Sequence, residues 1–250
     1  MVDYSYPLSS GESEELPVFC QTCQVKGTSV CADLSSREIT KLQARMSSTD
    51  YSKGDTISHQ GDEVTNLRVI THGTLKLYKV LEDGRQQITG FTHPGDFLGV
   101  APGSTLQVNV EALTEVRVCV FPHATLAHLS NTYPGSTKRL VEKANTELTK
   151  AYDHMLLLGQ KTVHERVASF FTALADQTGK PAPGEGPDAW FVPLPMPRRD
   201  IADYLALRSE TLSRVLKDLR SDGLIRDVTR QKLLVPSLAE LRSHTLLEID

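Results

Sequence analysis

The spacing of apolar residues changes along the chain and divides it into segments with different predicted secondary structure. Across residues 51–122, short alternations of apolar and polar residues, such as 75–80, are separated by glycine-containing turns. Strands at this spacing, with turn signals between them, are typical of a small antiparallel barrel or sandwich. Just upstream, residues 35–46 have a short helical pattern in which Ile39 and Leu42 are the apolar positions.

After residue 134 the spacing becomes helical and predicts one long helix. Its apolar and small residues follow each other at alternating steps of three and four, which is the seam of a heptad repeat. The seam residues are Val141, Ala144, Leu148, Ala151, Met155 and Leu158. Such a seam is typical of a helix that pairs with a second copy in a homodimer, although a helix packed on its own domain has the same pattern. His154 falls beside the seam, where its charge would act on the monomer–dimer balance.

Residues 198–223 are predicted to form two helices joined by a turn near 207–208, with Ser209 as the N-cap of the second helix. That second helix has two stripes offset by two residues, and two residues rotate by about 200° around a helix. The apolar stripe is Leu212, Val215, Leu216 and Leu219, and the polar stripe is Glu210, Ser213, Arg214 and Lys217. The polar stripe therefore points away from the core and offers groups that read base edges. A solvated charged face is the alternative, but the helix-turn-helix context favours double-stranded DNA as the partner.

A hairpin is predicted after the second helix, across residues 225–235 with its turn near 229–231. Residues 196–235 contain nine Lys and Arg against six Asp and Glu, a local charge of +3 on a chain whose net charge is −4. Local positive charge of this kind supports binding to phosphates, and Arg226, Arg230 and Lys232 are placed to touch them. We expect DNA backbone contacts from Arg199, Ser209, Thr211, Lys217 and Arg230.

The composition is that of an ordinary globular protein, with 39% hydrophobic and 23% charged residues. A length of 250 residues allows one large domain or two to three small ones. No apolar run is long enough to cross a bilayer, and the first nineteen residues contain neither Lys, Arg nor the apolar stretch of a signal peptide. We therefore expect a cytoplasmic protein that does not enter the membrane. In that compartment, clustered cysteines are more often metal ligands or redox groups than disulfides.

The cysteines of the chain fit a single four-thiolate site, with three near the N-terminus and one far downstream: Cys20, Cys23, Cys31 and Cys119. In residues 115–120 the valines alternate onto one face, so Cys119 falls on the other face with Arg117, away from the apolar side chains. Four cysteines suit a structural zinc ion and an iron–sulfur cluster equally well, and spacing alone does not separate them. A thiol switch, in which Cys20 and Cys23 form a disulfide, is a third possibility.

No motif in the chain predicts an enzyme. A dinucleotide fingerprint, a P-loop and a nucleophile elbow are all absent from the sequence. A redox enzyme with a ferredoxin-like cluster, the nearest enzymatic alternative, would therefore lack a second cofactor. The scattered histidines, His93 among them, do not recur at metal-ligand spacing, and we interpret them as ordinary turn or surface residues.

These segments together resemble the Crp-Fnr superfamily of bacterial transcription regulators over nearly the whole chain. Residues 199–214 resemble the recognition motif E-x-x-S-R of the Fnr-type branch, with Glu210, Ser213 and Arg214 at the matching positions. The resemblance implies an α+β fold that begins with an antiparallel β-roll sensor domain of the cyclic-nucleotide-binding kind. A long dimerisation helix and a C-terminal winged helix-turn-helix would follow. The implied parts are 1–33 for the cysteine segment, 34–133 for the β-roll, 134–162 for the helix and 163–250 for the winged helix-turn-helix.

The same resemblance implies a role for the cysteines. Fnr-type oxygen sensors bind a [4Fe–4S] cluster with three N-terminal cysteines and one from the sensor domain, and Cys20, Cys23, Cys31 and Cys119 match that plan with the spacing C-x2-C-x7-C. It also implies a homodimer that binds a palindrome of the TTGAT-N4-ATCAA type and recruits RNA polymerase as an activator when oxygen is low. We expect no cyclic nucleotide, because residues 99–111 lack the arginine that holds its phosphate in cyclic-nucleotide-binding relatives.

Overall fold

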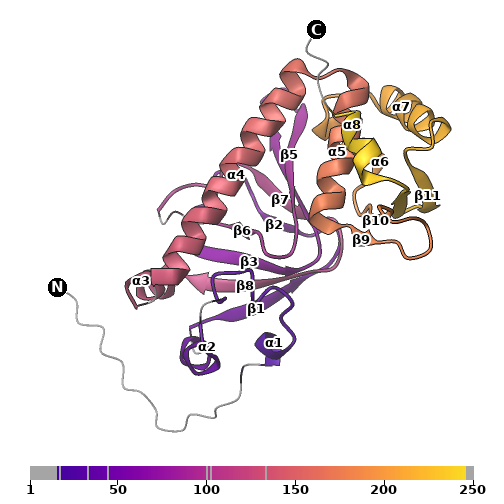
Figure 1. Cartoon of the computed structure of the whole chain (residues 1–250). Coiled ribbons are helices and arrows are strands. Elements are labelled where there is room, and N and C mark those ends of the chain that lie inside the picture. The colour runs from indigo at the N-terminus through magenta and orange to yellow at the C-terminus, as the bar shows by residue number, and fades with distance from the viewer. Residues whose placement is uncertain are drawn as a thin grey trace.

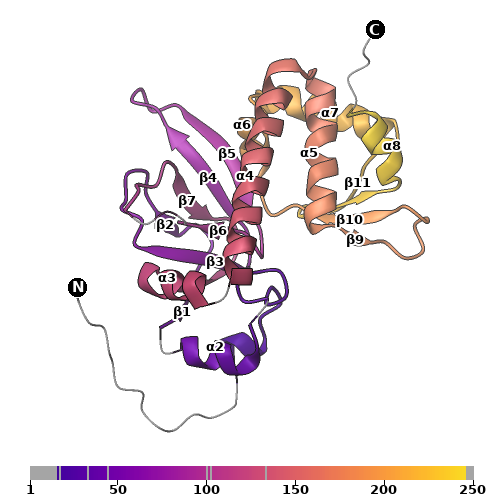
Figure 2. The ribbon, with the colours of Figure 1, turned by 60° about the vertical axis from the view of Figure 1, so that its left-hand side comes forward.

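The computed structural model describes residues 16–245 except 17, 33, 44, 100, 102 and 133. Most of the first half of the chain forms a β-roll, and the last third forms a smaller α/β unit (Figure 1). One long helix lies between the two and runs along the side of the roll (Figure 2). This arrangement confirms the α+β fold and the order of parts predicted from the sequence.

The roll is built from two four-stranded sheets in which every strand pair is antiparallel. The first sheet has the order β1-β8-β3-β6 and the second the order β2-β7-β4-β5. Residues such as Ile70, Leu75 and Val118, all completely buried, fill the space between the sheets. The strands are β1 (Ser47–Tyr51), β2 (Thr56–Ser58), β3 (Asn66–His72), β4 (Leu75–Val80), β5 (Gln86–Thr92), β6 (Phe97–Leu98), β7 (Asn109–Ala112) and β8 (Val116–Pro122).

The glycine-containing turns predicted from the sequence join these strands, and Gly73 shows why one of them requires glycine. Its φ is +85°, and a Cβ atom there would lie 2.2 Å from the backbone oxygen of Glu115. Any larger residue would clash with the chain that follows β7, and its backbone would also be strained. The turn between β3 and β4 therefore depends on this residue.

Four helices surround the first sheet: α1 (Val18–Gln21), α2 (Ser36–Gln43), α3 (His123–Thr132) and α4 (Pro134–Gln160). The structure confirms the helix predicted near residues 35–46 and the long helix after 134. Helix α3, which follows β8 directly, was not predicted, because its apolar residues show little helical periodicity. Helix α4 ends at Gln160, and Thr162 caps α5 through a reciprocal pair of hydrogen bonds with Glu165. No described helix is long and apolar enough to cross a membrane.

The C-terminal unit packs four described helices and a small sheet of order β11-β12-β10-β9 around its own core. The predicted helix-turn-helix is formed by α6 and α7, and the predicted hairpin by β11 and β12. In the turn between α6 and α7, Ala206 adopts a left-handed conformation with φ of 52°. The elements are α5 (Val163–Thr178), β9 (Lys180–Pro181), β10 (Trp190–Pro193), α6 (Arg198–Tyr204), α7 (Ser209–Ser221), β11 (Arg226–Thr229), β12 (Lys232–Val235) and α8 (Leu238–Ser243).

Helix α6 joins the C-terminal unit to the roll. Lys76 on β4 is buried, and its Nζ lies 3.0 Å from Glu111 on β7 and 3.6 Å from Asp200 on α6. At the end of the same helix, the carboxylate of Asp203 accepts hydrogen bonds from the Ile88 backbone N–H at 3.2 Å and the Gln86 side chain at 3.2 Å. The first helix of the helix-turn-helix is thus held by charged and polar contacts to strands of the roll.

Candidate functional site

The four cysteines come together, although they belong to three different segments. Cys20 lies on α1, Cys23 and Cys31 lie on the loop that follows, and Cys119 lies on β8. All four line one cavity of about 30 Å³, and all four are free thiols. The structure therefore brings together the set of residues that the sequence singled out.

The seven residues between Cys23 and Cys31 form a compact turn. The backbone oxygen of Val25 accepts hydrogen bonds from the N–H groups of Thr28 and Ser29, at 3.1 and 2.9 Å. Val25 and Val30 are buried at the two ends of this turn. Apolar anchors at both ends explain how a gap of this length still returns Cys31 to the cavity.

The same loop touches the start of the long helix. The hydroxyl of Ser136, completely buried near the N-terminus of α4, donates a hydrogen bond to the backbone oxygen of Val30 at 3.0 Å. Leu140, one turn further along α4, packs into the apolar cluster that contains Val30 and Cys119. A displacement of the loop would therefore act directly on α4.

The surroundings of Cys119 correct one prediction. The valines of β8, Val116 and Val118, face the core of the roll, and Cys119 faces the other way, as predicted. Cys119 is nevertheless only 8% exposed and packs among apolar side chains, including Val69 and Phe121. The prediction considered β8 alone, whereas the N-terminal segment and α2 cover this face of the sheet.

Burial favours the protonated form of three of these thiols, those of Cys20, Cys31 and Cys119, when no metal replaces the protons. It raises the pKa of the Cys31 thiol to about 12, with a further contribution from Cys20. Burial likewise raises the pKa of Cys119 and of Cys20, and the neighbouring cysteines add to both shifts. Lys26 acts in the opposite direction on Cys20 and Cys31, because its positive charge favours thiolates. A metal group that binds here must displace the protons.

The rest of the cavity wall fits a soft, anionic metal group. It is mostly apolar, with Ile39, Met46 and Phe121 among its residues, and Lys26 supplies a cation. As they stand, no three His, Cys, Asp or Glu side chains among the described residues lie close enough together to hold a single metal ion. The sequence reasoning did not identify Lys26, whose only signal is its position between Cys23 and Cys31.

Helix α7 presents the predicted reading face. Leu212, Val215, Leu216 and Leu219 are buried in the C-terminal core, whereas Glu210, Ser213, Arg214 and Lys217 are exposed. Within the described part of the chain, none of these four polar side chains has a hydrogen bond or an ion pair. A stripe of unpaired donors and acceptors on the outer side of a helix-turn-helix is suited to reading base edges.

The start of α7 corrects a second prediction. The N-cap is Arg208, which makes no side-chain cap hydrogen bond, and Ser209 is the first residue of the helix. The turn occupies residues 205–208 and begins earlier than the predicted turn near 207–208, because α6 ends at Tyr204. Ser209 and half-buried Thr211 remain on the first turn of α7, where helix N–H groups favour an anion such as a phosphate.

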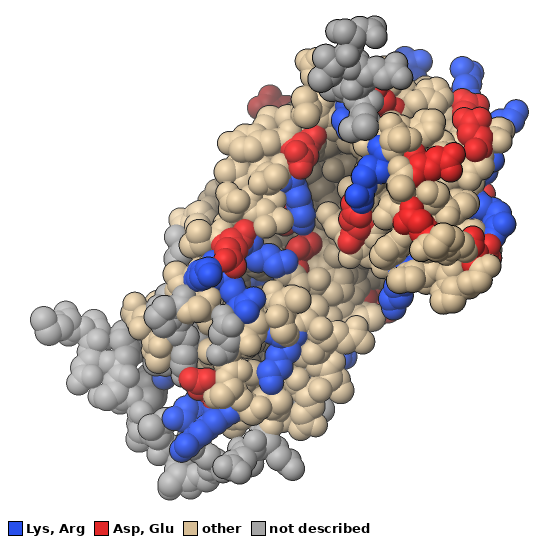
Figure 3. All heavy atoms as spheres, viewed as in Figure 1, with Lys and Arg blue, Asp and Glu red and all other residues tan. Residues whose placement is uncertain are grey.

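The basic residues around α7 differ in how free they are. Arg230, at the tip of the hairpin, is exposed and has no partner among the described residues, and Arg199 is exposed beside Asp200 at 3.2 Å. Arg226 pairs with Glu185 at 2.6 Å, and the Lys232 Nζ lies 3.7 Å above the ring of Phe191. Basic and acidic side chains are interspersed on the visible face of this unit (Figure 3). Arg230 is thus better placed for a phosphate contact than Arg226 or Lys232.

The predicted seam of α4 lies on the outside of the chain. Val141, Leu148 and Met155 are exposed by 64%, 50% and 59%, which is unusual for large apolar side chains. Ala144 and Ala151 are exposed between them, and Leu158, near the helix end, is half-buried.

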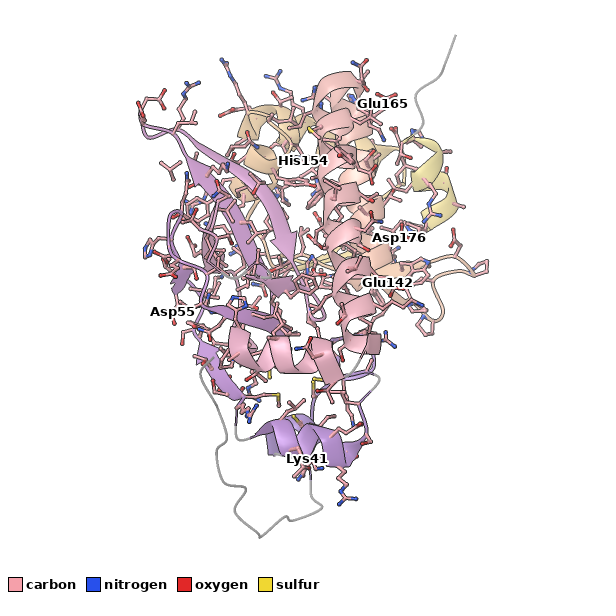
Figure 4. All side chains as sticks on the ribbon, turned by 90° about the vertical axis from the view of Figure 1, so that its left-hand side faces the viewer. Lys41, Asp55, Glu142, His154, Glu165 and Asp176 are labelled. Carbon is pink, nitrogen blue, oxygen red and sulfur yellow. The ribbon has the colours of Figure 1, made fainter. Side chains whose placement is uncertain are left out.

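His154 does not belong to this exposed face. The ring of His154, which Figure 4 labels on α4, stacks on Tyr204 of α6 with the centroids 4.1 Å apart, and Nε2 lies 2.9 Å from the Tyr204 backbone oxygen. Burial lowers the pKa of His154, so its neutral form is favoured. The heptad pattern placed this residue beside the dimer seam, but the helix turns it towards the C-terminal unit of its own chain.

Comparison with known proteins assigns both the β-roll and the C-terminal unit to known domain families. Residues 48–133 match the cyclic nucleotide-binding domain family, and residues 165–244 match the Crp-like helix-turn-helix domain family. The first match covers the β-roll, and the second covers the unit that carries the exposed stripe of α7. A domain of the cyclic nucleotide-binding family joined to a Crp-like helix-turn-helix defines a DNA-binding transcription regulator.

Several transcription regulators are similar in sequence to this chain over most of its length. The nitrogen fixation regulation protein FixK of Bradyrhizobium diazoefficiens is 36% identical over 83% of this chain and 86% of its own length. The transcriptional activator protein FnrL of Cereibacter sphaeroides is 32% identical over 89% of this chain and 90% of its own length. The structure of FixK2 from Bradyrhizobium japonicum has a TM-score of 0.72 at 30% identity and covers 81% of this chain and 98% of that one. The chain belongs to the Crp-Fnr family of transcription regulators and is not an enzyme.

Proposed function

We propose that this regulator responds to oxygen through a [4Fe–4S] cluster held by Cys20, Cys23, Cys31 and Cys119. The observation that carries the proposal is the convergence of these four thiols on one buried, largely apolar cavity. When bound, the cluster would supply iron–sulfur chemistry that oxygen destroys. The protein residues hold it, shield it from water and transmit its presence to α4.

The arrangement of the thiols favours a cluster over zinc. A zinc ion holds four sulfurs at about 2.3 Å, so the sulfurs lie about 3.8 Å from one another. The described thiols share a cavity without being gathered as tightly as a single ion requires. In a [4Fe–4S] cluster each cysteine binds a separate iron, so the sulfurs stand further apart. Lys26 in the wall offsets the negative charge of four thiolates.

The loop between Cys23 and Cys31 provides the link to the output. A cavity of about 30 Å³ has room for no more than a few waters, so loading the site displaces this loop. Val30 on the loop bonds to Ser136, and Leu140 packs in the same apolar cluster. We infer that the loaded loop sets the position of α4 and thereby favours pairing of its exposed seam with a second copy.

The proposed homodimer would present two copies of α7 to the two halves of a palindrome. Glu210, Ser213 and Arg214 would read bases, and Arg230, Arg199 and Lys217 would contact phosphates. We propose a site of the TTGAT-N4-ATCAA type, activation through RNA polymerase at low oxygen, and no response to cyclic nucleotides. The last point rests on residues 99–111, which contain no Lys or Arg to hold a phosphate.

The test is purification without air, followed by a visible spectrum and measurement of iron, sulfide and zinc. A brown protein with equal iron and sulfide is expected. Exposure to air should bleach it, convert dimer to monomer in sedimentation, and weaken binding to a duplex with the palindrome. A colourless protein with one zinc per chain would establish the zinc alternative. A protein with neither metal, whose DNA affinity follows thiol oxidation, would establish the thiol switch.

A further inference from the structure

A second hollow lies directly outside the cysteine cavity. It is an open groove of about 460 Å³ formed by β1, β3, β8 and the chain around Cys23. The groove and the cavity share three wall residues: Cys23, Thr71 and Arg117. These residues therefore separate the buried thiols from the outer groove, and a molecule that passes from one to the other passes between them.

Among these wall residues, Arg117 can move most easily. Its guanidinium donates two hydrogen bonds to the Asp50 carboxylate, with Nε 2.6 Å from Oδ1 and Nη2 3.0 Å from Oδ2. The Arg117 side chain is 49% exposed and the Asp50 side chain is 66% exposed. The paired geometry favours one position for the guanidinium, but water can replace either partner, so the pair opens readily. The Thr71 hydroxyl, by contrast, is tied to the backbone oxygen of Arg117 at 3.0 Å.

The cysteines differ in their relation to the groove. Cys23 lines both hollows, whereas Cys20, Cys31 and Cys119 line the inner cavity. Cys119, on the floor of the cavity, is 8% exposed. A molecule that enters from the groove meets Cys23 first and reaches Cys119 after passing Arg117.

We propose that Arg117, held by Asp50, gates the cysteine cavity, admitting small molecules from the Cys23 side and excluding larger ones. The purpose of such a gate rests on the proposed function. A diatomic molecule must reach the thiol-bound group, whereas bulky thiols and chelators must be kept from its ligands. The gate itself is a property of the protein without any metal and can be measured there.

The test is alkylation of the reduced, metal-free full-length protein with two neutral reagents, iodoacetamide and a maleimide that carries a pyrene group. Mass spectrometry of peptides gives the initial rate at each cysteine. Both reagents attack the same thiolate, so the ratio of their rates cancels any change in thiol pKa. We expect Cys23 to react first, and Cys119 to react with the small reagent much faster than with the large one. In Arg117→Ala the small-to-large ratio at Cys119 should fall severalfold, with the ratio at Cys23 unchanged.

Arg117→Lys keeps the charge but loses the paired hydrogen bonds, and should give an intermediate ratio. Asp50→Asn, which leaves Arg117 in place, should loosen the gate if Arg117→Ala fails to fold. Arg85→Ala is the matched control, because Arg85 is an exposed arginine paired with Asp83 at 2.8 Å on the β4–β5 turn. Equal labelling of all four cysteines by both reagents would mean that the N-terminal segment detaches as a whole, and it would overturn the gate. An unchanged ratio in Arg117→Ala would do the same.

Iron and sulfide analysis of the same variants, loaded without air, separates this proposal from the proposed function. If the wild-type protein never binds iron, the cluster proposal is wrong, but the alkylation ratios still test the gate proposal. If the cluster does assemble, Arg117→Ala should bleach faster than Arg85→Ala in the presence of a bulky chelator.

Discussion

The cysteine cavity and the reading face of α7 are built in opposite ways. The reading face belongs to one helix, whose buried leucines and Val215 fix it to the C-terminal core. The cavity exists only because α1, its following loop and β8 meet across a long stretch of chain. The reading face needs only its own domain, whereas the cysteine cavity needs the N-terminal segment to be docked on the roll. This combination suits a switch in which the cavity is the input and the reading face is the output. The input can come apart without unfolding the part that reads DNA.

The two regions are connected through α4 and α6. Loop residue Val30 bonds to the start of α4, and His154, near the other end of α4, stacks on Tyr204 of α6. Lys76 and Asp203 add direct contacts between the roll and α6. The chain thus offers a continuous set of contacts from input to output, and each prediction below disrupts one side of this comparison or the link.

The largest expected effect is on the input. Cys119→Ser should abolish assembly of the proposed cluster, because it removes the one proposed ligand that lies on the roll and would tie the N-terminal segment to it. Iron and sulfide in protein purified without air should fall to background, while the fluorescence of Trp190, the single tryptophan, still reports a folded C-terminal unit. A Cys119→Ser protein that stays brown would remove this residue from the ligand set and with it the contrast between the two regions.

The next effect is on the link. Lys76→Met removes the buried cation between Asp200 and Glu111 and leaves the buried Asp200 carboxylate with only the exposed Arg199 beside it. Breaking a buried ion pair costs about 3–5 kcal/mol. Urea unfolding followed through Trp190 should show this loss, or the two units should unfold in separate steps. Lys79→Met is the matched control, since Lys79 is an exposed lysine on the same strand. Equal stability of both variants would show that the roll does not hold α6.

The sequence predicted these two regions unequally well, for the same reason that they are built differently. The stripe of Glu210, Ser213 and Arg214 could be predicted because helical periodicity within one segment fixes which side chains are buried. Residue type was enough to predict which cysteines form the site. It did not predict the apolar surroundings of Cys119, because α2 and the N-terminal loop supply them. His154 was misplaced for a similar reason: the heptad frame contains no information about α6.

The third prediction concerns the reading face. Arg214→Ala should cost about 1–3 kcal/mol of binding free energy at the preferred palindrome and relax the preference at one base pair, as removal of a base contact does. Binding to duplexes with single substitutions, at fixed salt, measures both effects. Loss of the same size on every duplex would instead mean that Arg214 contacts a phosphate. Iron content should not change, because α7 lies outside the cysteine site.

The smallest effect is expected at the tip of the hairpin. Arg230 is exposed and without a partner among the described residues, so Arg230→Ala should leave the fold and the base preference unchanged. Its loss should weaken binding to all duplexes alike and reduce the slope of log affinity against log salt concentration by about 1, as expected for one phosphate contact. Arg226→Ala is the control: Arg226 already pairs with Glu185, so it should change this slope less. A changed base preference in Arg230→Ala would place the hairpin among the elements that read sequence and would extend the output beyond a single helix.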